Sequence, residues 1–180
     1  SYETSSLTTH SLWPSNTSAS ADWVKTPNIL KASYNQSGNK VLYTIKNGDI
    51  KEYVVAEADG NDVRLTILND QLQVVPTEIN WDPYDDNAVF ILVGTTLYHT
   101  KISADAVGKT ISSDVISYSY ESNKQVYYAK KSTINSTVSI EKSNIDGSDK
   151  TTIIDSIAPS TSYVFSRTPK NDTLAILSKD

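Results

Sequence analysis

Side chains that could act as a nucleophile or a general base are few in this sequence of 180 residues. The chain has no Cys and only two His, His10 and His99. Ser and Asp are abundant, but there is no Gly-x-Ser-x-Gly elbow and no spacing that favours a Ser-His-Asp group. We therefore predict no catalytic residue, and we interpret His99 as a residue on the solvated or channel-facing side of a strand.

Oxygen ligands for a metal gather in one place, the acidic turn that holds Asp82, Asp85 and Asp86. Calcium takes about six to eight oxygen ligands, so three carboxylates supply only part of a shell. Asp is also an ordinary turn residue, because its carboxylate accepts hydrogen bonds from nearby backbone amides. The six Gly form no phosphate-binding loop, and the six Glu show no pair suited to glycoside hydrolysis. We predict no bound metal and no cofactor.

The charge pattern and the length of the apolar runs argue against nucleic-acid binding and against membrane insertion. The net charge is −5, and the basic residues are 14 scattered Lys and two Arg, so no basic stripe is available for nucleic acid. Apolar runs such as 88–93 are far shorter than the roughly 20 residues that cross a bilayer, which predicts no membrane insertion within this chain.

Four windows of ten residues align without gaps and reveal a repeat. Each window has a polar turn followed by an apolar, β-rich run, and the windows begin at Tyr34, Asp82, Ser119 and Arg167. Their anchoring apolar residues are Val41, Val89, Val126 and Leu174, at spacings of 48, 37 and 48 residues. Periods near 40 to 50 residues are typical of propeller blades.

Turn signals divide each repeat into strands. Asn47-Gly48 predicts a hairpin with a type I′ turn, and Asp-Gly recurs at Asp59-Gly60 and Asp146-Gly147. Val, Ile and Thr together number 49 residues, which favours strands, and no stretch of twelve or more residues has helical periodicity. We also predict that the segment 71–79 is not helical, because it is rich in β-branched residues and contains Pro76. Each repeat is therefore expected to form a four-stranded antiparallel sheet, with strands at about 40–46, 50–57, 63–68, 88–93, 96–102, 125–130, 137–144, 150–154 and 173–177.

The repeat resembles the TolB-type, WD40-like β-propeller repeat. The matching segments are Ser37-Gly38-Asn39-Lys40-Val41-Leu42-Tyr43, the run from Asp59 to Thr66, the run from Ser122 to Tyr128, and Ile145-Asp146-Gly147-Ser148. The usual Ser-Pro-Asp-Gly turn survives only in variants, as at 81–86. The resemblance implies an all-β propeller, or an arc of a propeller, of about four blades. Similar repeats occur in periplasmic and surface proteins of bacteria and in propeller domains attached to serine peptidases.

Aromatic residues at the entrances of the repeats are the candidates for binding. They are Trp81, Tyr34, Tyr84, Tyr118 and Tyr120. Tyr and Trp give a large contact area at a low entropy cost, which suits a binding face. Propellers also place aromatic residues between blades, so packing remains an alternative.

The expected domain plan has an arm and a set of blades. Residues 1–27 are a Ser/Thr-rich arm or closing strands, and blades are expected at about 28–80, 81–117, 118–164 and 165–180, the last one partial. In a closed four-bladed ring, residues near 6–12 would pair with the strand near 173–177. The alternative is an arc of a larger ring; because the sequence has no Met, we expect a processed product or an excised piece.

These features predict a non-catalytic propeller module of a bacterial cell-envelope or surface protein, which acts as an interaction or scaffold surface. The expected partner is a protein or a cell-wall glycan, and the expected location is the periplasm or the cell surface. Two alternatives stay open: the accessory propeller of a larger, prolyl-oligopeptidase-like serine peptidase, and a glycan-binding propeller.

Overall fold

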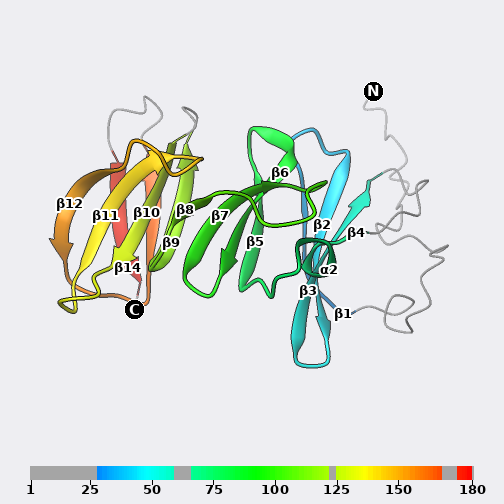
Figure 1. Ribbon diagram of the computed structural model, residues 1–180, viewed down its shortest axis with the longest axis horizontal. Coiled ribbons are helices and arrows are strands. Elements are labelled where there is room, and N and C mark those ends of the chain that lie inside the picture. Colours follow the sequence, from blue (N-terminus) through cyan, green and yellow to red (C-terminus); the bar gives the residue numbers. More distant parts are fainter. Residues whose placement is uncertain (1–27, 59–65, 122–124, 168–173, 180) are drawn as a thin grey trace, which may run out of the picture. The chain divides into compact units, whose positions relative to one another are not determined.

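The computed structural model describes residues 28–58, 66–121, 125–167 and 174–179. It divides into two compact units, residues 1–68 and residues 69–180. The described residues form antiparallel β-sheets in which each strand pairs with the next one along the chain (Figure 1). The prediction of an all-β chain built from four-stranded antiparallel sheets is confirmed.

The first unit contains one sheet of four strands, sheet A. Its strands are β1 (Asn28–Tyr34), β2 (Lys40–Asn47), β3 (Ile50–Glu57) and β4 (Thr66–Ile67). Residues on one face of its two central strands form a small core cluster of Val41, Tyr43, Ile45, Val54 and Ala56. The turn between β1 and β2 holds the buried Asn35, whose side-chain oxygen accepts a hydrogen bond of 3.0 Å from the Lys40 amide.

The second unit contains three sheets. Sheet B consists of β5 (Glu78–Asp82), β6 (Asp85–Val93), β7 (Thr96–Lys101) and β8 (Thr110–Ser112). Sheet C consists of β9 (Val115–Glu121), β10 (Gln125–Lys131), β11 (Val138–Asn144) and β12 (Thr151–Ile157). In sheet D the described strands are β13 (Ser162–Arg167) and β14 (Leu174–Lys179).

Apolar cores lie between consecutive sheets of this unit. Phe90, Leu97 and Ile111 of sheet B share a buried cluster with Val126 and Tyr128 of sheet C. A second cluster joins sheet C to sheet D, with Tyr163 packed on residues that include Ala129, Val138 and Ile140. This arrangement, in which the face of one sheet packs on the next, buries apolar side chains on both faces of sheet C.

Three anchoring residues of the sequence repeat occupy equivalent buried positions. Val41, Val89 and Val126 are each 0% exposed and lie on the second strand of sheets A, B and C. The fourth anchor, Leu174, begins β14. The repeat therefore records one buried position in each of sheets A, B and C.

The hairpin at Asn47-Gly48 differs from the predicted turn type. Asn47 pairs with Ile50, so the two loop residues are Gly48 and Asp49, and of these the positive φ of 60° belongs to Gly48. Gly at the first of two loop positions suits a type II′ turn rather than the type I′ turn expected. The hairpin between β6 and β7 repeats this arrangement with Gly94, whose φ is 58°.

A short helix, α2 (Leu68–Leu72), corrects the expectation that residues from Gln71 onward avoid helix. Leu68 and Leu72 lie four residues apart and are both buried, so one helical turn places both on one face. Gln73 then adopts a positive φ of 52°, and the amide of Val74 donates to the Asn69 carbonyl at 3.2 Å. This is a Schellman ending, which stops the helix before Pro76. No helix in the described ranges is long and apolar enough to cross a membrane.

Five strands fall outside the ranges predicted from the sequence, namely β1, β5, β8, β9 and β13. Most of them mix polar and apolar residues; β9, for example, reads VISYSYE. Their place in a sheet is fixed by pairing with an apolar neighbour strand rather than by their own composition.

Candidate functional site

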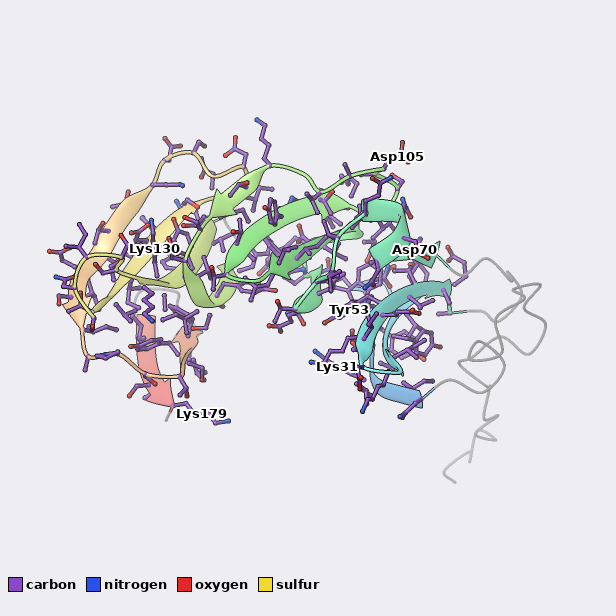
Figure 2. The ribbon with its side chains drawn as sticks, turned by 60° about the horizontal axis from the view of Figure 1, so that its bottom comes forward. Lys31, Tyr53, Asp70, Asp105, Lys130 and Lys179 are labelled. Carbon is purple, nitrogen blue, oxygen red and sulfur yellow. The ribbon has the colours of Figure 1, made fainter. Side chains whose placement is uncertain are left out.

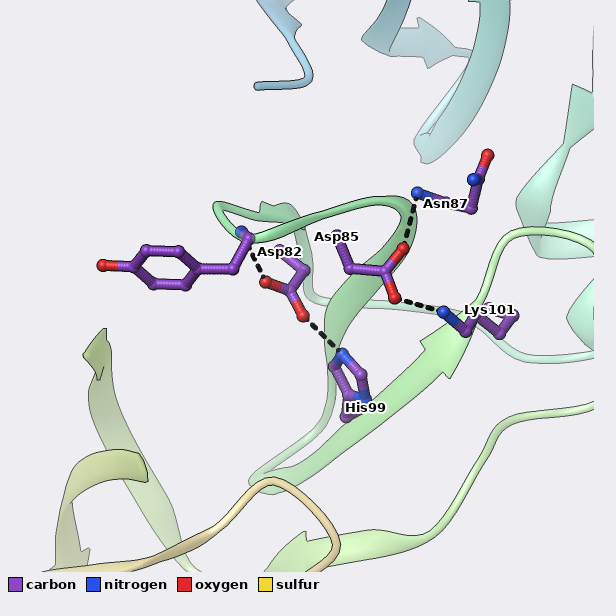
Figure 3. Close-up of polar contacts among 6 residues, drawn as sticks. Asp82, Asp85, Asn87, His99 and Lys101 are labelled. Atoms are coloured by element: carbon purple, nitrogen blue, oxygen red, sulfur yellow. Dashed lines mark hydrogen bonds and ion pairs between the residues drawn. The ribbon is translucent and has the colours of Figure 1, made fainter. Parts of the chain in front are cut away.

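The turn between β5 and β6 is built around a buried carboxylate. Asp82 ends β5 and is only 2% exposed. One of its oxygens accepts the Tyr84 amide hydrogen at 2.8 Å, and the other lies 2.8 Å from Nε2 of His99 on β7 (Figure 3). Because a buried charge needs partners, this pair and this amide together fix the path of the turn.

A second ion pair lies on the same turn. The Lys101 ammonium donates to Asp85, and the Asn87 amide donates to the other Asp85 oxygen at 3.0 Å (Figure 3). The hydrogen bond from Lys101 is the main reason that the pKa of Asp85 lies below its usual range. Asp82 and Asp85 therefore bind different side chains, His99 and Lys101 respectively.

Three tyrosines meet beside this turn, and we call Tyr84, Tyr118 and Tyr120 the tyrosine cluster. The rings of Tyr84 and Tyr120 contact edge to face, with centroids 5.2 Å apart and planes at 70°. Phe90 of sheet B packs on Tyr120 and on Tyr118, with ring centroids 4.9 Å and 5.8 Å apart. The Asn80 side chain donates to the Tyr118 hydroxyl at 2.8 Å. The cluster thus spans sheets B and C.

The environment of the cluster combines burial with negative charge. Burial, followed by the charge of Asp82, raises the pKa of Tyr120 to about 12. Tyr84, in contrast, is 51% exposed at the tip of the turn. The cluster therefore combines a partly buried tyrosine, Tyr120, with an exposed one, Tyr84.

The structure brings together three of the five predicted binding residues. Trp81 follows Asn80 on β5 and pairs with Val89, so strand alternation places it on the opposite face of sheet B from Asn80 and the Tyr118 hydroxyl. Tyr34 ends β1 in the first unit and is 50% exposed.

Sequence reasoning missed the pairing of Asp82 with His99. The register of sheet B places Asn80 opposite Phe90, and Phe90 opposite His99, so these three residues share one face. The His99 side chain is 14% exposed and packs on Phe90 at a centroid distance of 4.9 Å. The hairpin at Gly94, which the sequence does indicate, sets this register and was the available signal.

The chemistry available at this pair is limited by its partners. A Ser-His-Asp group needs a hydroxyl on the His nitrogen that faces away from the carboxylate. Within the described ranges, the His99 side chain makes a hydrogen bond with Asp82, and no Ser or Thr hydroxyl bonds to it. His10 lies outside the described residues, and the described part of the chain holds no group of three His, Cys, Asp or Glu side chains suited to a metal.

Comparisons with known proteins identify the fold. No family model matches the sequence, and the search of curated proteins finds no relative. A crystal structure of the eukaryotic initiation factor is similar, with a TM-score of 0.59 and 10% identity, over 84% of this chain and 40% of that one. Oligopeptidase B from Leishmania major has a TM-score of 0.56 and 13% identity, over 85% of this chain and 24% of that one.

The fold is of the β-propeller type. At these identities the similarity concerns the fold alone, and this chain spans less than half of either structure. The four-stranded sheets are thus propeller-type blades.

Proposed function

We propose that this chain is a non-catalytic β-propeller module that binds a partner protein through the tyrosine cluster. The observation that carries the proposal is the half-exposed ring of Tyr84. The ring contacts Tyr120 edge to face, and the Tyr84 backbone amide donates a hydrogen bond to the Asp82 carboxylate. An aromatic side chain that is already ordered loses little entropy on binding, and such residues dominate many protein interfaces.

The buried contact between His99 and Asp82 supports this role. His99 and Asp82 orient the turn without taking up the exposed ring, so Tyr84 stays available for contact. We further propose, on the resemblance to the TolB-type repeat, that the module belongs to an extracytoplasmic protein of a bacterium and acts there as an interaction or scaffold surface.

The test compares three baits: the unchanged chain, Tyr84→Ala and Tyr34→Ala. Tyr34 is a matched control because it is also a half-exposed tyrosine close to the end of a strand, with 50% exposure against 51% for Tyr84. Quantitative pull-down from an extract of the source cells should give a protein that the unchanged chain and Tyr34→Ala retain equally. Tyr84→Ala should lose it by about tenfold or more, the effect of one interface hot spot. Equal retention by all three baits would contradict the proposal.

A second candidate function is favoured by the similarity to oligopeptidase B. In that case this chain is the accessory propeller of a larger serine peptidase, and another domain carries the nucleophile. The parent reading frame would then encode a Gly-x-Ser-x-Gly elbow in an α/β-hydrolase segment. Under both proposals, the isolated chain turns over no peptide or ester substrate; turnover that is lost on changing one Ser would refute both.

A further inference from the structure

A polar hollow of about 330 Å³ lies on sheet C, away from the residues of the tyrosine cluster. It is lined by strands β10, β11 and β12, by the loop between β10 and β11, and by Asp114. All of its lining residues are polar or charged. Figure 2 marks Lys130, which lies on β10 beside β11 and contributes one of the charges.

The loop that forms the rim, residues 132–137, is ordered by its own hydrogen bonds. The Ser132 hydroxyl oxygen accepts from the amides of Ile134 and Asn135 at 3.3 Å each. The Thr137 hydroxyl donates to the Asn135 side-chain oxygen at 2.9 Å. The amide of Lys131 donates to the Asp114 carbonyl at 2.8 Å, which ties the start of the loop to the connection between β8 and β9. The hollow is therefore formed by a loop of defined shape.

Opposite charges share this hollow without forming ion pairs in the described structure. Lys130 and Lys131 lie with the carboxylates of Asp114, Glu141 and Asp155, and no ion pair joins these lysines to these carboxylates in the described structure. The lysines offer only donors, and the ionised carboxylates offer only acceptors. The formal charge of this group is −1, from two Lys and three acids.

The ligand chemistry follows from this mixture. An apolar ligand would leave these donors and acceptors without partners, which is costly. A simple anion faces three carboxylates, and a simple cation faces two ammonium groups. A hydroxyl group both donates and accepts, so a ligand with several hydroxyls can serve the lysines and the carboxylates at once. We infer that this hollow binds a neutral saccharide.

The inference is tested by titrating the full chain with a panel of neutral mono- and disaccharides, using saturation-transfer NMR and calorimetry. The Lys-Glu dipeptide and galacturonic acid serve as charged comparisons. At least one neutral sugar should bind, and Lys130→Met and Asp155→Asn should each weaken it by about tenfold, as expected for the loss of a hydrogen bond to a charged group.

Lys150→Met and Asp105→Asn are the matched controls, because both residues are exposed and neither lines the hollow. They should change the affinity for the sugar by less than about twofold. The inference is overturned if no neutral sugar binds, if the hollow variants bind as the unchanged chain does, or if the dipeptide or galacturonic acid binds more tightly than every neutral sugar. Far-UV circular dichroism checks that each variant is folded.

Discussion

The carboxylate of Asp82 is buried, and its hydrogen-bond partners are one His ring and one backbone amide. We predict that His99→Ala lowers the free energy of unfolding by about 3 kcal/mol, because it leaves a buried carboxylate oxygen without its side-chain hydrogen-bond partner. Urea unfolding at neutral pH measures this loss.

Lys101→Ala is the matched control for this prediction. It breaks the other aspartate pair of the same turn, in which the Lys101 and Asp85 side chains are 55% and 34% exposed. Such a pair contributes less than about 1 kcal/mol. If the two substitutions cost the same, the burial of Asp82 is not what makes its pair important.

Tyrosine ionisation gives a pH prediction at the same scale. Burial, helped by nearby negative groups, raises the pKa values of Tyr43 and Tyr120 from 10.0 to about 12. A pKa that is raised on folding adds stability that is fully present below the unfolded value and is lost as pH rises through the folded value. The chain should therefore lose stability between pH 10 and pH 12.

Absorbance at 295 nm during an alkaline titration measures this behaviour directly. Of the 11 tyrosines, Tyr43, Tyr120 and Tyr128, whose pKa values burial raises, should ionise late in the folded chain and near the ordinary value in urea. Tyr120→Phe should remove the late ionisation of one tyrosine and leave those of Tyr43 and Tyr128. A single transition near pH 10 for all tyrosines of the folded chain would show that these side chains are more hydrated than the structure indicates.

Among the elements, the turn between β11 and β12 meets the neighbouring sheet at Gly147. Its φ is +78°, and a Cβ at this position would lie 2.5 Å from the Thr110 carbonyl oxygen on β8. Gly147→Ala combines the cost of a left-handed backbone with a clash between sheets, so we predict a loss of roughly 2 to 4 kcal/mol in the free energy of unfolding.

Gly94→Ala separates these two costs. Gly94 has a φ of +58° in the same unit, but a Cβ there meets nothing within 4 Å. Only the backbone cost of about 1 kcal/mol is expected. Urea melts that give equal losses for both variants would show that the turn does not pack on β8.

The strands that could be predicted are those with strong local signals. The second strands carry the anchors Val41, Val89 and Val126, and the hairpins after two of them carry Gly48 and Gly94. Strands such as β5 and β9 lack such signals, because half-polar runs gain their stability from neighbours that are already paired. The helix α2 was missed because the prediction considered the β-branched residues after it. The burial of Leu68 and Leu72 on one face stabilises this short helix despite the low helix propensity of the segment that follows.

At the scale of the whole molecule, the sequence repeat predicts the type of sheet but not which side chains meet. The tyrosine cluster joins the turn after β5 to strand β9, more than thirty residues later in the chain, through the packing of two sheets. Trp81 and Tyr34 have similar positions in the repeat, yet strand alternation places Trp81 on the other face of sheet B from Asn80, and Tyr34 belongs to the first unit. A repeat aligns equivalent positions, whereas a site requires residues from unlike positions.

The arm before the first sheet gives a prediction for the whole chain. Eleven of the first twenty residues are Ser or Thr, so this segment offers few apolar atoms for burial. In an arc, deleting residues 1–25 should change the free energy of unfolding by less than about 0.5 kcal/mol.

In a closed ring, residues near 6–12 would instead add a strand to β14, which in the described residues pairs with β13 alone. The same deletion would then expose an entire strand edge and lower the urea midpoint strongly. We expect the small change, and a large drop in the midpoint would establish the closed ring.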